Sequence, residues 1–214
     1  MHFNNLNSNI MMFDDKYKEV RSQAVGSYRE KGSKFISYSF PVYSENDIIE
    51  KINIIKKKER SASHYCYAYI LNPDKSAKRF SDDGEPSSTA GKQIYNQILS
   101  SDLTNILIIV VRYYGGRKLG IPGLIRSYKN AAIDAIEKSE FVIKNIEEEY
   151  LISFKYDEIN KVMRLIKDNN LKISNKEINE YCKITVSIPR KNSEEIIKKV
   201  NENYKLNIKY IKTK

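Results

Sequence analysis

The chain has 214 residues, a formal net charge of +10 and a hydrophobic fraction of 41%, which is enough apolar material for one large domain or two small ones. No apolar run reaches the roughly 18 residues of a membrane-spanning helix, and the Asn-rich segment 1–13 lacks the layout of a signal peptide. The two cysteines, Cys66 and Cys182, stand outside any CxxC pair, which argues against a zinc framework or a disulfide scaffold and predicts a reduced, cytoplasmic protein.

We expect residues 1–15 to form a tail ahead of the first folded domain. Met11 and Met12 offer alternative starts of translation, and with either of them residues 1–10 would not be made. The folded part of the chain is expected from residue 16 onwards.

Residues 16–141 carry the pattern of a first domain in which strands and helices alternate. Strands are predicted from short apolar and β-branched runs over 23–29, 34–42, 64–71 and 105–111. Apolar residues at helical spacing predict helices that begin at Ser44, near Thr89 and at Pro122. The run at 105–111 is apolar on both faces, which is typical of a central strand covered on both sides.

Residues 142–214 are predicted to form a second, smaller domain, because glycine disappears after Gly123 and the pattern changes. The predicted order is strand 150–156, a helix capped by Asp157, strands 171–177 and 181–188, a helix capped by Ser193, and strand 206–211. This order is the split βαβ, or ferredoxin-like, pattern. The sequence therefore predicts an α+β protein of two domains.

A glycine-rich loop, residues 112–123, follows the apolar strand and leads into a helix. Glycine lets the backbone approach a ligand closely, and a helix start offers free N–H groups and partial positive charge, both of which suit an anion. The prediction is an anion or nucleic-acid site made by Arg112, Gly115, Gly116, Arg117, Lys118, Gly120, Gly123 and Arg126. The alternative is a turn whose glycines serve only backbone geometry, since the spacing matches neither a Walker loop nor a dinucleotide fingerprint.

The position of these cations is better evidence than the total charge. A basic balance favours a phosphate-bearing partner, but lysines such as those at 56–58 suit a solvated helix face equally well. Tyr113, Tyr114 and Tyr128 interleave with the cations of the loop and its helix. Exposed tyrosines there would stack on bases, whereas buried ones would belong to the core.

A second loop, residues 80–91, carries carboxylates and hydroxyls and leads into the helix predicted to begin near Thr89. We interpret it as a partner loop for the cations, with His64, Asp82, Asp83, Gly84, Glu85, Ser87 and Thr89 as its site residues. Three interpretations stay open: a Mg²⁺ site, a phosphate site at the helix start, and a turn with a helix cap. The motifs predict no catalytic residue, no metal and no cofactor.

His64 and Cys66 face the same side of their predicted strand, so together they could supply metal ligands or a nucleophile with its base. One histidine and one cysteine fall short of a zinc set. A triad of Ser87, His64 and Asp83 can be drawn, but Ser87 is not in a G-x-S-x-G elbow. We favour a histidine that is hydrogen-bonded to the acidic loop.

Three ordered motifs closely resemble the IMPACT/YigZ family. They are the stretches 64–69 (HYCYAY), 81–91 (SDDGEPSSTAG) and 111–128 (VRYYGGRKLGIPGLIRSY). The resemblance implies an N-terminal α/β sandwich similar to the second domain of ribosomal protein S-five and a C-terminal ferredoxin-like domain similar to one in elongation factor G. Ser88 and Pro122 stand where the family usually has glycine.

The resemblance also bears on function. Eukaryotic IMPACT proteins restrain a starvation-sensing kinase that controls translation initiation, and bacteria lack that kinase pathway. We therefore expect a non-catalytic regulator or accessory factor of translation that binds RNA, the ribosome or another phosphate-bearing partner through the two loops. The alternatives are an enzyme, hydrolase-type and possibly Mg²⁺-dependent, that acts on a small phosphorylated substrate, and a protein-interaction module. The oligomeric state is not predicted.

Overall fold

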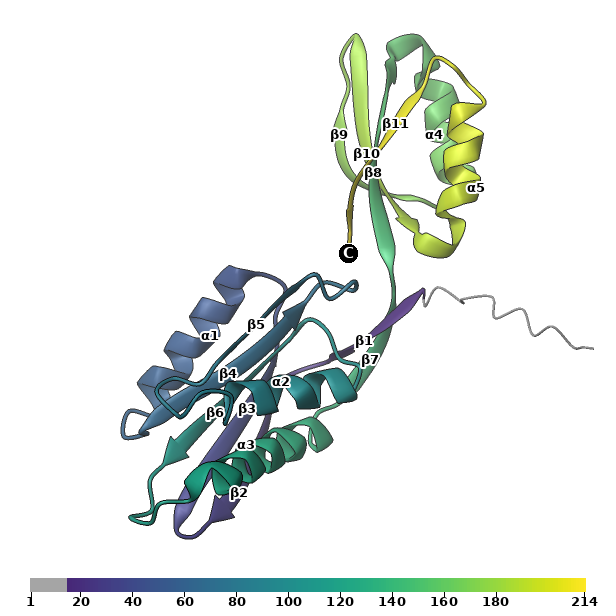
Figure 1. Ribbon diagram of the computed structural model, residues 1–214. Helices are drawn as coiled ribbons and strands as arrows, with labels where there is room; N and C mark the ends of the chain where they lie inside the picture. Colours follow the sequence, from purple (N-terminus) through teal and green to yellow (C-terminus); the bar gives the residue numbers. More distant parts are fainter. Residues whose placement is uncertain (1–14) are drawn as a thin grey trace, which may run out of the picture.

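The computed structural model describes residues 15–214 (Figure 1). The predicted tail lies outside the described residues apart from Asp15, as do the alternative starts at Met11 and Met12. The described chain is a mixed α+β protein with two domains, as predicted. No helix in residues 15–214 is long and apolar enough to span a membrane.

The N-terminal domain is built on a five-stranded antiparallel sheet. Its strands, in spatial order, are β2 (Ala24–Glu30), β3 (Ser33–Pro41), β6 (Ile106–Tyr113), β4 (His64–Leu71) and β5 (Ala77–Ser81). The predicted central strand is confirmed, because β6 lies in the middle of the sheet and residues 106–111 are fully buried.

Helices cover both faces of this sheet. Ile106, Ile108 and Val110 of β6 pack with α2 (Gly91–Ser100) and α3 (Gly120–Glu137), whereas the alternate residues Leu107, Ile109 and Val111 belong to a cluster with α1 (Glu45–Lys58). Successive side chains of a strand point to opposite faces, so one apolar strand serves two cores. The buried stripe of α3 includes Leu124, Tyr128 and Ala131.

The helices begin where local capping chemistry favours it. Ser44 caps α1, because its Oγ accepts a hydrogen bond from the Asp47 N–H at 3.1 Å, as predicted. Pro122 is the third residue of α3, where a helix has no internal partner for a backbone N–H, so proline is tolerated.

A two-stranded antiparallel ribbon links the domains: β1 (Lys16–Val20) pairs with β7 (Phe141–Asn145). The chain then enters β8 (Glu147–Lys155) of the second domain. The predicted boundary between residues 141 and 142 falls at the start of β7, whose partner strand is at the N-terminal end of the described chain. The strands β1, β5 and β7 were not predicted from the sequence; they are five residues each and mostly exposed or half-buried.

The C-terminal domain has the predicted ferredoxin-like topology. Its antiparallel sheet has the order β11 (Asn207–Thr213), β8, β10 (Tyr181–Pro189), β9 (Lys172–Glu177). Helices α4 (Ile159–Asp168) and α5 (Arg190–Asn201) lie on one side of that sheet (Figure 1). Their apolar residues, among them Val162, Ile166, Ile196 and Val200, form one cluster with the inward residues of β8 and β10.

Both predicted caps in this domain are wrong. Ser193 lies inside α5, which already begins at Arg190, and its Oγ donates to the Arg190 carbonyl at 2.8 Å. Asp157 lies in a short 3₁₀ turn, η1 (Tyr156–Glu158), that precedes α4. In each case helical backbone begins before the predicted cap, at Tyr156 in η1 and at Arg190 in α5.

Candidate functional site

Asp82 organises the acidic loop from within. Its carboxylate accepts hydrogen bonds from the backbone N–H groups of Ser88 (2.9 Å), Ala90 (3.0 Å) and Gly91 (2.8 Å), at the start of α2. An aspartate at a helix start satisfies unpaired donors and complements the helix dipole. The loop therefore supplies its own anion at the α2 N-terminus, which favours the interpretation as a capped turn over a phosphate site or a Mg²⁺ site.

Glu85 and Arg112 form a buried ion pair that joins the acidic loop to the end of β6. Arg112 Nη1 lies 2.6 Å from Glu85 Oε1, and the two side chains are only 8% and 4% exposed. The same carboxylate oxygen accepts a hydrogen bond from Tyr128 Oη on α3 at 2.9 Å. The Arg112 guanidinium also lies over the rings of Phe35 and Tyr114. Arg112 thus orders the loop from within the protein, and its predicted contact with an anion stays a prediction.

His64 and Cys66 contact the acidic loop from β4. His64 Nδ1 is 2.9 Å from the Asp83 carbonyl oxygen, while the Asp83 carboxylate accepts from the Tyr65 N–H at 2.6 Å. Cys66 is fully buried, and its Sγ donates to the Asp82 carbonyl oxygen. Burial raises the pKa of the Cys66 thiol, which disfavours a nucleophilic thiolate.

The predicted histidine that is hydrogen-bonded to the acidic loop is confirmed. Its Nε2 also lies 3.9 Å from Glu85 Oε1, but that oxygen already accepts from Arg112 and Tyr128. The triad of Ser87, His64 and Asp83 is not assembled, because His64 meets the Asp83 backbone and the Asp83 carboxylate is held by a backbone N–H.

Residues 86–89 form a turn that explains the unusual Ser88. The Thr89 N–H donates to the Pro86 carbonyl at 3.1 Å, and Ser88 at the third turn position has a φ of +63°. A type II turn requires positive φ at that position, which glycine adopts most easily. Thr89 itself is buried, and its Oγ1 donates to the Pro86 carbonyl at 2.6 Å. Thr89 therefore acts within the turn.

The glycine-rich loop is anchored against the hairpin between β2 and β3. A Cβ on Gly115 would lie 2.0 Å from the carbonyl carbon of Gly32, so no side chain fits there. The Gly115 N–H also points to Ser33 Oγ at 3.2 Å. By contrast, Gly116 has a φ of +81° and open space around its missing Cβ. The base of the loop is thus fixed by packing, while its tip projects outward.

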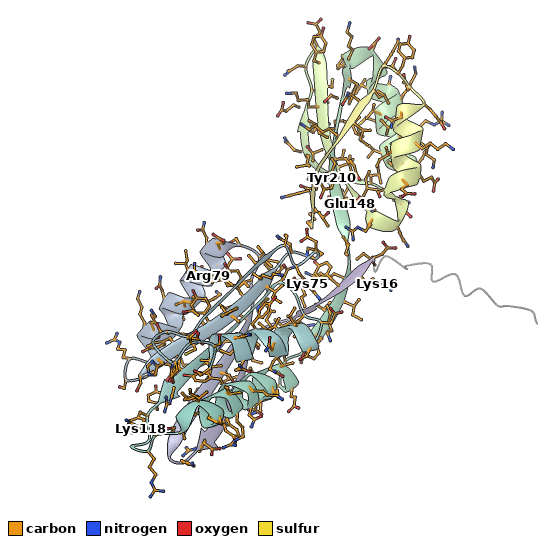
Figure 2. All side chains as sticks on the ribbon, viewed as in Figure 1. Lys16, Lys75, Arg79, Lys118, Glu148 and Tyr210 are labelled. Atoms are coloured by element: carbon orange, nitrogen blue, oxygen red, sulfur yellow. The ribbon has the colours of Figure 1, made fainter. Side chains whose placement is uncertain are left out.

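The four cations of this loop and its helix divide into two kinds. Arg112 is buried with Glu85, and Arg126 Nη2 lies 2.9 Å from Glu30 Oε1, which holds the pKa of the Glu30 carboxyl below its usual value. Arg117 and Lys118 are exposed, and within residues 15–214 neither has an ion-pair partner. Figure 2 shows Lys118 at the end of the N-terminal domain that points away from the C-terminal domain.

The start of α3 adds backbone donors beside these two cations. No side chain caps this end, and Leu119 at the cap position has a helical backbone. Tyr114, 51% exposed, and Ile121, 58% exposed, flank the cationic pair. Tyr128 is fully buried in the core instead, so of the three interleaved tyrosines only Tyr114 offers a large exposed ring.

The structure brings the bases of the two loops together, but it corrects the expectation of one electropositive site that collects all the cations. Glu85, Arg112 and Tyr128 join the loops below the surface. Two residues of this arrangement were not predicted from the sequence, Glu30 and Gly32. Both belong to the hairpin between β2 and β3, where Glu30 pairs with Arg126 and Gly32 packs against Gly115. Only covariation between distant positions could have indicated those partners, since Glu30 and Arg126 are 96 residues apart.

Comparison with known proteins places this architecture in a family. Residues 31–136 match the model of the Impact N-terminal domain. The IMPACT family member YigZ of Escherichia coli (strain K12) is 31% identical over 140 residues, which are 64% of this chain and 69% of the relative. The chain belongs to the IMPACT family. An IMPACT family member of Haemophilus influenzae is 30% identical over 189 residues, which are 87% of this IMPACT protein and 92% of the relative.

A solved structure is similar to this IMPACT protein over both domains. It is a crystal structure described as that of a hypothetical protein, with 26% identity and a TM-score of 0.74 over 92% of this chain and 98% of that one. The likeness therefore extends beyond the matched N-terminal segment to the C-terminal domain.

Proposed function

We propose that this IMPACT-family protein is a regulator or accessory factor of translation that binds RNA, free or in the ribosome, through the tip of the glycine-rich loop. The observation that carries the proposal is the pair Arg117 and Lys118, which are exposed and have no carboxylate partner in the described chain. The link to translation rests on the resemblance to eukaryotic members of the family.

The geometry around the pair suits a phosphate-bearing partner. Arginine grips phosphate through two parallel N–H groups, and lysine adds a compact charge. The exposed Tyr114 ring beside them suits stacking on a base. The buried Glu85–Arg112 pair and the Gly32–Gly115 contact hold the base of the loop, so the tip is presented on a fixed support.

The test is the affinity of the full chain for a fluorescent structured RNA at low salt. We expect the double variant Arg117→Ala/Lys118→Ala to bind at least tenfold more weakly, because two phosphate contacts are lost. The matched control is Lys57→Ala/Lys198→Ala, which removes the same charge from exposed positions on α1 and α5. Equal weakening by both double variants, or none by the first, would contradict the proposal.

A pull-down before and after nuclease treatment separates RNA from protein partners. Capture of ribosomal components that survives nuclease and still depends on Arg117 and Lys118 would assign the loop to an acidic protein surface instead. We expect capture by the wild-type chain to be lost after nuclease treatment.

A further inference from the structure

The C-terminal sheet has one face that its helices do not cover. Along β10, Cys182, Ile184 and Val186 point into the cluster under α4 and α5, so Tyr181, Lys183 and Thr185 point to the opposite side. Figure 1 shows both helices on one side of the sheet only.

Strand register gathers lysines on this open face. Tyr181 is paired with Lys155 at the end of β8, and Lys183 with Ser153. On β11, Lys209 is paired with Leu151, which also alternates with buried residues of β8 and therefore shares the face. Three cations thus lie on one surface, one on each of the neighbouring strands β11, β8 and β10.

These three lysines form no ion pair with a carboxylate of the described chain. Lys155, Lys183 and Lys209 are exposed, and none has an ion-pair partner within the described residues. One carboxylate, Glu177 on the edge strand β9, is opposite Lys183 in register. The part of the face around Lys155, Lys183 and Lys209 therefore carries a net positive charge.

The part of the face nearer the domain junction differs, because ion pairs offset the charge of its lysines. Lys212 and Lys214 both lie near Glu149, and Lys172 lies 3.0 Å from Glu147. The hydrogen bond from Lys214 holds the pKa of Glu149 below its usual value, so the Glu149 carboxylate stays ionised and offsets the neighbouring lysines. Among residues 15–214, the lysines of this face that have no ion-pair partner lie in the half farther from the domain junction.

An aromatic ring lies among the uncompensated lysines. Tyr181 is 63% exposed on a central strand, with the Lys155 ammonium 5.8 Å from its ring centroid. The geometry points to single-stranded RNA as the ligand of this face, with lysines on phosphates and Tyr181 stacked on a base. RNA-binding domains with the same strand and helix order use the same face, with aromatic residues on the central strands.

This inference rests on the proposed function only in that both assign an RNA partner, and different residues in different domains carry the two. Lys118 of the loop pair is at the end of the N-terminal domain that points away from the C-terminal domain (Figure 2). Either assignment of RNA binding can therefore be refuted while the other holds.

The experiment measures binding of the full chain to a fluorescent single-stranded uridine oligonucleotide at low salt. We expect Lys155→Glu/Lys183→Glu to weaken binding at least tenfold and to reduce the slope of affinity against salt, because phosphate contacts are lost. The control is Lys167→Glu/Lys198→Glu, the same charge change on the helix side of the same domain. Equal losses in both double variants would show a non-specific charge effect and overturn the inference.

The aromatic contribution has its own matched pair. Tyr181→Ala should weaken binding several-fold with an unchanged salt slope, since base stacking contributes to affinity but releases no counterions. Tyr204→Ala, at a ring that is 90% exposed elsewhere in the domain, should have no effect. Unchanged oligonucleotide binding in both Tyr181→Ala and the double lysine variant would reject this face, and loss only in Arg117→Ala/Lys118→Ala would assign all binding to the loop.

Discussion

At the scale of single residues, the buried Glu85–Arg112 pair is the main support of the candidate site. Glu85→Gln leaves the Arg112 cation buried without a counter-charge, and loss of one partner of such a pair costs roughly 3–5 kcal/mol. We expect this destabilisation in urea unfolding. Arg126→Gln breaks the exposed contact to Glu30 and should leave the unfolding curve close to that of the wild type. Similar curves for the two variants would contradict the assignment of Arg112 as an internal support.

Ser88 is a second residue whose conformation makes a prediction. Its φ of +63° strains a residue with a side chain, and no hydrogen bond of its Oγ occurs in the described chain. Ser88→Gly should therefore raise the free energy of unfolding by about 0.5–1 kcal/mol. Ser87→Gly, at the preceding turn position without positive φ, should be neutral or slightly destabilising. The result that would contradict this account is stabilisation by Ser87→Gly and none by Ser88→Gly in thermal unfolding.

At the scale of elements, Glu158 ties the start of α4 to the segment before β11. Its carboxylate lies 2.9 Å from Lys161 Nζ and accepts from Asn203 Nδ2 at 2.9 Å, and Lys205 Nζ lies at 3.3 Å. These contacts, the one to Lys161 first, lower the pKa of Glu158 from 4.5 to about 2.

A lowered carboxylate pKa has a definite sign in the pH dependence of stability. The contribution of Glu158 is fully present above pH 4.5 and is lost as the pH falls towards 2, because the unfolded chain binds the proton more readily. The melting temperature of the wild type should therefore fall over this interval. The melting temperature of Glu158→Gln should fall less steeply over the same interval. A variant that keeps the full wild-type slope would show that other carboxylates cause it.

Elements with a strong apolar pattern could be predicted from the sequence, and those held by long-range partners could not. The central strand at 105–111 and the order of elements in the second domain could be predicted, because a run that is apolar on both faces and helical spacing are local signals. The short strands β1, β5 and β7 are edge or ribbon strands with few buried residues, and their existence depends on partners far along the chain.

The same reasoning separates the parts of the site that sequence could and could not give. His64 near the acidic loop and the glycine-rich turn followed from motifs. The roles of the cations did not, since an arginine looks alike in sequence whether Glu85 or Glu30 neutralises it or water surrounds it. Only the folded arrangement shows that Arg117 and Lys118 are the exposed pair.

At the scale of the whole molecule, the two proposed RNA-binding surfaces lie at separate places: the loop tip at one end of the N-terminal domain and the open face of the C-terminal sheet. Two weak phosphate contacts on one chain bind more tightly than either alone when a single partner spans both. A large RNA suits such an arrangement better than a small phosphorylated substrate, because neither surface encloses its ligand.

The most direct test of the central claim is the salt dependence of affinity for structured RNA, compared between the wild type and Arg117→Ala/Lys118→Ala. Each phosphate contact adds roughly 0.7–0.9 to the slope of log affinity against log salt. The account predicts a slope that is lower by about 1–2 in the double variant, with the control Lys57→Ala/Lys198→Ala unchanged. A wild-type slope near zero, or an identical slope in the loop variant, would contradict it.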